Sequence, residues 1–116
     1  MTSLTAPQID TTRLADLLSE AADQIAAAGD MAPADSTLVG LARLTSERLA
    51  EAQHQLAAHD CSALHQPIID AATTIDAFRR LANRDSHPQA GAVAALAGTF
   101  IVDAALTLRG DEVAPA

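Results

Sequence analysis

Aromatic side chains are nearly absent from this sequence of 116 residues, which has no tryptophan, no tyrosine and only two phenylalanines. A core built around large rings is therefore excluded. The chain holds 28 alanines instead, and alanine and leucine both favour helices. We expect an aliphatic helical core in which small residues let the backbones approach closely.

Lysine is absent as well, so the seven basic residues are all arginines, against 15 acidic residues and a formal net charge of -8. Nucleic-acid binding depends on cationic side chains that displace counterions from phosphates. The charge balance therefore argues against a nucleic-acid partner. Arg79, Arg80 and Arg84 do cluster, but near a predicted helix C-terminus, where cations complement the helix dipole.

Cysteine occurs once, as Cys61, which excludes an intramolecular disulfide and is compatible with a reducing compartment. The first residues, MTSLTAPQID, lack the basic region and apolar run that are typical of a secretory signal. We expect a cytoplasmic protein.

Four segments carry apolar residues at the three- and four-residue spacing of amphipathic helices. They predict helices over 11–28, 36–58, 67–83 and 88–109. Short connectors between them favour an all-α, antiparallel (up-down-up-down) four-helix bundle, with an irregular orthogonal bundle as the alternative. We expect one domain over 1–116, with flexible tails at about 1–9 and 110–116. The third helix either begins at Pro67 or follows a short turn and a kink there.

The spacing also predicts the residues that face the core. Leu49, Ile75 and Phe100 are expected to be buried. In the last helix, one predicted inner face is made of Val93, Leu96, Ala97, Phe100 and Ala104.

Three histidines and the cysteine fall in the stretch HQLAAHDCSALHQP, residues 54–67. His59, Cys61 and His65 are candidate metal ligands, but their spacing matches no recognised zinc pattern. Glu51 and His54 form the ExxH pair of di-iron bundles, although the helical spacing turns both away from the core and the chain has no second copy. We therefore expect a polar connector, no bound metal and no cofactor.

The last predicted helix is apolar on nearly every side, since residues 91–108 carry one charge, Asp103. The apolar run is shorter than a typical membrane span, so we expect no membrane partner. An apolar outer side favours burial against a second copy, most simply in a two-fold dimer. The candidate interface residues are Leu44, Leu81, Val102 and Leu106.

Asp103 has two interpretations. It forms a buried charge pair with Arg79 on the neighbouring helix, or it is a functional carboxylate in a helix-lined pocket.

No nucleophile elbow, phosphate-binding glycine loop or HExxH motif appears in the sequence, so we expect no enzyme. The composition and the apolar last helix favour a noncatalytic module for self-association or protein binding. The alternative is a bundle that senses a small ligand between its helices, or a metal at His59, Cys61 and His65.

Overall fold

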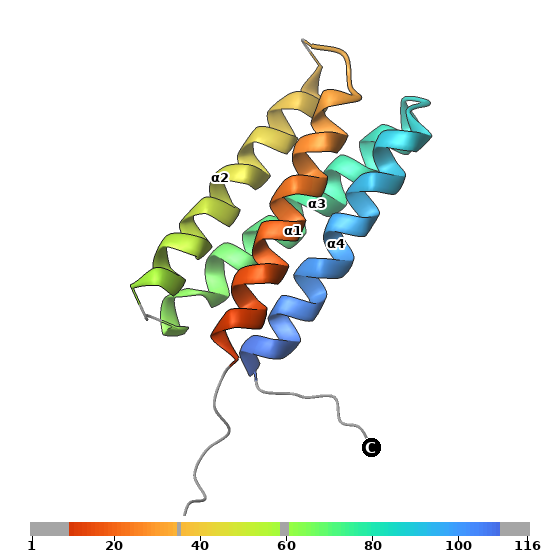
Figure 1. The fold of residues 1–116 in the computed structure, drawn as a ribbon. Coiled ribbons are helices and arrows are strands. Elements are labelled where there is room, and N and C mark those ends of the chain that lie inside the picture. The colour runs from red at the N-terminus through yellow and green to blue at the C-terminus, as the bar shows by residue number, and fades with distance from the viewer. Residues whose placement is uncertain (1–9, 35, 59–60, 110–116) are drawn as a thin grey trace, which may run out of the picture.

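A computed structural model describes residues 10–34, 36–58 and 61–109. Over these residues the chain forms α1 (Thr11–Asp30), α2 (Thr37–Ala57), a short 3-10 helix η1 (Cys61–Ala63), α3 (His65–Arg84) and α4 (Pro88–Arg109), with no strand. The helices run alternately up and down (Figure 1). The predicted four-helix bundle is confirmed. The tails predicted at 1–9 and 110–116 lie outside the described residues.

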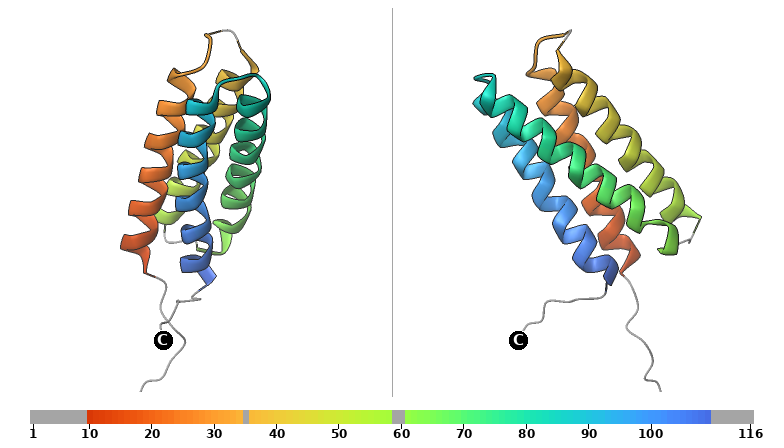
Figure 2. Two further views of the ribbon diagram at one scale, coloured as in Figure 1. Left: turned by 90° about the vertical axis from the view of Figure 1, so that its right-hand side faces the viewer. Right: turned by 180° about the vertical axis from the view of Figure 1, so that it is seen from behind.

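Each helix packs against its neighbours in the chain, and α4 closes the ring by packing against α1 (Figure 2). The helix ends agree with the predicted ones to within two residues. Because all connections are short and antiparallel, the start of α1 and the end of α4 lie at the same end of the bundle (Figure 1).

The core is aliphatic, as the composition predicts, with a single fully buried ring. This ring is that of Phe78, and the large aliphatic residues that are also fully buried include Leu14, Leu18, Ile25 and Leu49. Alanines fill the space between the helices. At one such contact a Cβ added to Gly29 of α1 would lie only 2.8 Å from the Cβ of Ala42 of α2, so these two backbones approach closely.

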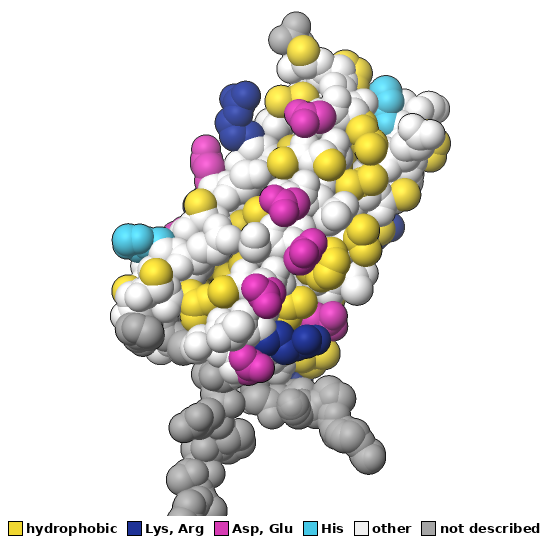
Figure 3. All heavy atoms as spheres, viewed as in Figure 1, with side chains coloured by type: hydrophobic (Ala, Val, Ile, Leu, Met, Phe, Trp, Pro, Cys, Tyr) yellow, Lys and Arg dark blue, Asp and Glu magenta, His cyan; other side chains and the backbone are white. Residues whose placement is uncertain are grey.

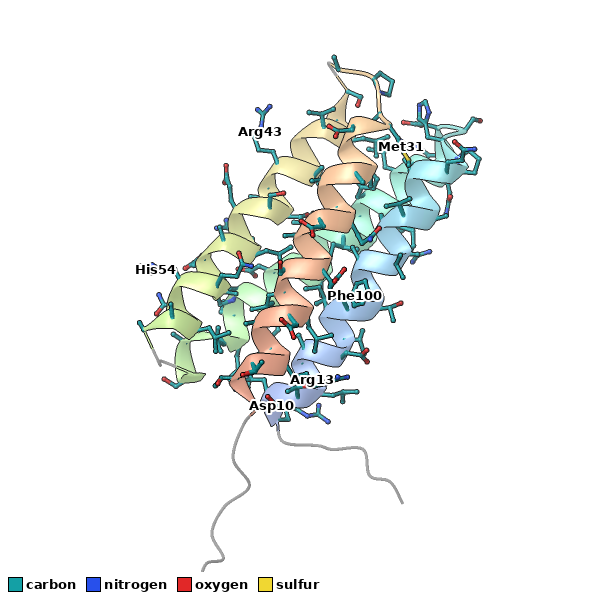
Figure 4. All side chains as sticks on the ribbon, in the orientation of Figure 1. Asp10, Arg13, Met31, Arg43, His54 and Phe100 are labelled. Atoms are coloured by element: carbon teal, nitrogen blue, oxygen red, sulfur yellow. The ribbon has the colours of Figure 1, made fainter. Side chains whose placement is uncertain are left out.

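Of the three residues predicted to be core, Leu49 and Ile75 are buried, but Phe100 is only half-buried. It lies at the boundary between α4 and α1 (Figure 4). The buried row of α4 instead comprises Ala90, Gly91, Ala94, Ala97, Ile101, Ala104 and Leu108. The prediction for Phe100 and for Leu96 was wrong, because the row of α4 that faces its close-packed neighbours is made mostly of alanines, with Ile101 and Leu108 as its large side chains.

One polar side chain is buried among the described residues, that of Thr45 on α2. Its Oγ1 lies 2.5 Å from Oγ1 of Thr74 on α3 and 2.8 Å from the carbonyl oxygen of Leu41. The Thr74 hydroxyl also lies 3.1 Å from the carbonyl oxygen of Ala71. Both hydroxyls are therefore satisfied inside the bundle.

The beginnings of α1 and α3 follow from local chemistry. Asp10 caps α1, since its Oδ1 accepts a hydrogen bond from the backbone N–H of Arg13 at 3.0 Å. Pro67 is the third residue of α3. Proline is tolerated at this position because the backbone N–H groups of the first turn of a helix have no intrahelical acceptor. The helix thus begins two residues before Pro67, directly after η1.

The end of α3 is a Schellman motif. The N–H of His87 donates to the carbonyl of Ala82 at 2.7 Å, and the N–H of Ser86 donates to that of Asn83 at 3.4 Å. Ser86 has φ 69°, the left-handed conformation that glycine adopts without a steric cost.

Ser86→Gly is expected to raise the free energy of unfolding by about 0.5–1 kcal/mol, because it removes the Cβ from a left-handed position. Ser19→Gly is the matched control, since Ser19 is exposed within α1, where glycine costs about 0.5 kcal/mol relative to serine. Urea unfolding of both variants measures the difference. Equal losses in the two variants would contradict the assignment of strain to Ser86.

Candidate functional site

The histidine-rich stretch does not assemble a site within the described residues. His54 is exposed on the outside of α2 and points away from the bundle (Figure 4), and His65 is exposed at the first residue of α3. His59 and the side chain of Cys61 lie outside the described part of the chain. Among the residues that are described, no three His, Cys, Asp or Glu side chains gather in a metal-binding arrangement.

The ExxH pair faces solvent. Glu51 and His54 are both exposed, and Glu51 lies 3.7 Å from the guanidinium of Arg48 rather than near a second carboxylate. Neither side chain projects into the bundle core, as the ligands of a di-iron site there would have to.

The most unusual surface lies on α4, on the side away from the core. Its row of side chains at alternating three- and four-residue spacing runs through Ala92, Ala95, Thr99, Val102 and Leu106, and we call it the α4 outer row. The first four are exposed, Val102 by 57%, and Leu106 is half-buried. None of the five side chains is charged.

A groove of about 420 Å³ runs beside this row, between α3 and α4. Its apolar wall includes Ala72 and Ile75 of α3 and Val102 of α4. Farther along the same helix pair, a smaller hollow is lined by Ile69 and Ala105, and Ile69 is 55% exposed. Exposed apolar surface thus continues from α4 onto α3.

Sequence reasoning missed Ile69. The signal was present, because Ile69 lies one residue off the apolar stripe of Ile68, Ala71 and Ile75 on the same helix. In the structure Ile68 is buried and Ile69 faces out.

The charged groups of the groove come from Asp76, Arg79 and Asp103. Arg79 donates to Asp76 at 2.6 Å, and Arg80 lies 2.9 Å from the same carboxylate. Within the described residues no ion pair joins Arg79 to Asp103, although both line the groove. The Asp103 carboxylate is half-buried and has no charged partner there.

The other two candidate interface residues lie on other helices, Leu44 on α2 and Leu81 on α3. Leu44 shares a helical face with Arg48, whose guanidinium lies 4.0 Å from the carboxylate of Asp70 on α3. Leu81 shares a helical face with Thr74, whose hydroxyl contacts that of Thr45 on α2. Both leucines are half-buried, and Leu81 packs against the core. The four candidates are thus spread over three helices, α2, α3 and α4.

The acidic residues concentrate elsewhere. Asp16, Glu20, Asp23 and Asp30 are exposed along α1. Figure 3 shows acidic side chains spaced along this helix, while apolar side chains gather over the neighbouring α4. The outer side of α4 is thus the less charged part of this view.

Comparisons with models of known protein families, with curated proteins and with solved structures find no match to this chain. Among the described helices, α4 is long and apolar enough to cross a membrane, which is weak evidence because core helices of soluble proteins meet the same criterion.

Proposed function

We propose that this protein is a noncatalytic interaction module that self-associates through the outer side of α4. The observation that carries this proposal is the exposure of Val102 at the centre of an apolar surface that continues across the groove to Ile69. Burying such surface contributes roughly 25 cal/mol per Å² to association.

The charge pattern favours a protein partner over a lipid surface. Helices that lie on membranes are rich in Lys and Arg beside their apolar face. The only ionisable residues of α4 are Asp103 and Arg109, and the chain as a whole is acidic. Association through the outer row places few carboxylates in the contact.

The expected affinity is modest. One helix face covers less than the roughly 800 Å² per partner of a standard interface, so we expect a dissociation constant in the micromolar range. Sedimentation of the wild type therefore has to reach high micromolar concentration.

Val102→Glu is expected to weaken self-association by about tenfold or more, because the added carboxylate must lose water without gaining a partner. Ala50→Glu adds the same charge at an exposed position of α2 and should leave association nearly unchanged. Sedimentation measures both, and circular dichroism checks that the helices persist. A wild type that stays monomeric, or equal effects of the two variants, would contradict the proposal.

A further inference from the structure

We propose that the face shared by α1 and α4 is a docking site for an amphipathic helix of a basic partner protein. Phe100 of α4 lies on this face, at the boundary with α1 (Figure 4). The α4 outer row borders the groove toward α3 instead. The inference therefore concerns a different surface and a different partner from the proposed self-association.

Four large apolar side chains lie along the boundary of α1 and α4. They are Met31 at the end of α1 and Val93, Leu96 and Phe100 of α4, and we call them the boundary strip. Met31 is 48% exposed and Leu96 45%, while Val93 and Phe100 are half-buried against the core. The three residues of α4 follow steps of three and four, so they share one side of the helix.

The types of side chain in the strip suit a contact with another protein. Phe100 is one of only two rings in the chain, and it lies at the surface rather than in the core. Aromatic residues and methionine are enriched in the buried centres of protein interfaces. The flexible side chain of Met31 can adapt to the shape of a partner. The strip thus offers large apolar anchors, which the alanines of the α4 outer row do not.

The exposed side of α1 next to this strip carries a row of acidic residues. Asp16, Glu20 and Asp23, the α1 carboxylates, follow steps of four and three and are all exposed. Like charges at this spacing repel and destabilise a helix. Among the described residues none of the three is in an ion pair, whereas Asp70 and Asp76 of α3 each lie beside an arginine. A cationic partner would relieve the repulsion within α1.

The α1 carboxylates and the boundary strip lie at the same level of the bundle. The start of α1 and the end of α4 are at one end (Figure 1). Glu20 lies nine residues after Thr11, the first residue of α1, and Phe100 lies nine residues before the last residue of α4. Both are therefore about 13 to 14 Å from that end at the rise of a helix. A single helix laid along the boundary would contact both features.

The chemistry of this face defines the partner. An amphipathic helix presents apolar anchors at steps of three and four, which suits the boundary strip. Lysine or arginine on its flank would pair with the α1 carboxylates, and such charges fix the orientation of a complex and speed its formation. The one basic residue of α1, Arg13, lies near the start of the helix. A second copy of this chain, with a net charge of -8, is disfavoured here by repulsion.

A synthetic peptide tests the inference. It spans about five helical turns, with leucines at steps of three and four, lysines on both flanks, alanines elsewhere and a fluorophore at one end. Fluorescence anisotropy with the full-length protein is expected to show saturable binding that weakens as salt is raised. A peptide of the same composition, reordered to have no apolar face, should bind about tenfold more weakly. Equal binding of the two peptides would reduce the effect to attraction between net charges and overturn the inference.

A first pair of variants tests the location of the charge contact. Glu20→Lys and Glu47→Lys change the net charge equally, at exposed positions of α1 and α2. Glu20→Lys is expected to weaken binding of the peptide by about tenfold, because it reverses a charge that faces the basic flank. Glu47→Lys should change it by less than about twofold, since only long-range attraction is altered. Equal losses would place the peptide elsewhere on the molecule and contradict the docking site.

A second pair tests the apolar contact. Leu96→Ser and Val102→Ser each remove an exposed apolar side chain from α4, but from different sides of the helix. Leu96→Ser is expected to weaken binding by about tenfold, the loss of an apolar anchor, and Val102→Ser to leave it unchanged. Circular dichroism checks that the helices persist in all four variants. A loss in Val102→Ser as large as that in Leu96→Ser would overturn the assignment to the boundary strip.

The outcomes separate this inference from the proposed self-association. Peptide binding is measured at a protein concentration too low for self-association, and sedimentation without peptide is measured at a high one. A wild type that binds the peptide but sediments as a monomer would overturn self-association and leave the docking site standing. A wild type that self-associates but does not bind the peptide would overturn the docking site alone.

Discussion

Phe78→Ala is expected to lower the free energy of unfolding by about 3–5 kcal/mol, because it removes a fully buried ring and leaves a cavity between four helices. Phe100→Ala, which deletes the same atoms from the half-buried boundary of α4 and α1, should cost only about 0.8–1.5 kcal/mol, half the transfer free energy of a buried ring. The two phenylalanines are thus matched controls for each other.

Urea unfolding at a protein concentration too low for the proposed self-association compares these variants without a contribution from association. Similar losses for the two substitutions would mean that Phe100 is as deeply packed as Phe78, and would contradict the orientation of α4 in this fold.

Ala97→Leu should destabilise the bundle by about 3 kcal/mol, the upper part of the range for added volume in a well-packed core. Ala97 is fully buried in the inward row of α4, where close approach of α1 and α3 leaves no room for a longer side chain. Ala50→Leu makes the same change at an exposed position of α2 and should be nearly neutral.

Thermal unfolding followed by circular dichroism measures both variants, with the second as reference. If Ala97→Leu unfolded at the same temperature as Ala50→Leu, the inward row of α4 would lie elsewhere on the helix.

The fold could be predicted from the sequence because each of the first three helices has a single apolar stripe. On α2 the stripe from Leu38 to Leu56 is the buried face in the structure, and Glu51 and His54 face out as expected. Caps and turns then set the helix ends, as with Asp10 before α1. Periodicity and capping depend on residues that are close in the sequence, so the amino-acid sequence alone is enough to detect them.

The orientation of α4 could not be predicted in the same way. Several of its stripes are apolar, so hydrophobicity alone does not distinguish the stripe with Phe100 and Leu96 from the buried row, which combines alanines with Ile101 and Leu108. The choice depends on how closely α1 and α3 approach, which is a property of three helices together. The same dependence applies to Leu81, which the spacing places outside the core but which is half-buried and packs against it.

The hydrogen bond between the Thr45 and Thr74 hydroxyls favours one axial alignment of α2 and α3 over others that this composition would allow. A core of alanines and leucines with repeating spacing can be packed nearly as well after one helix slides past its neighbour by a turn, about 5.4 Å. Sliding α3 along α2 would keep the carbonyl contacts of Thr45 and Thr74 within their own helices, but it would part the two hydroxyls. A lost hydrogen bond of about 1 kcal/mol corresponds to a factor of about five in population. This hydrogen bond thus stabilises the native alignment of the two helices relative to the alignment in which they are shifted by one turn.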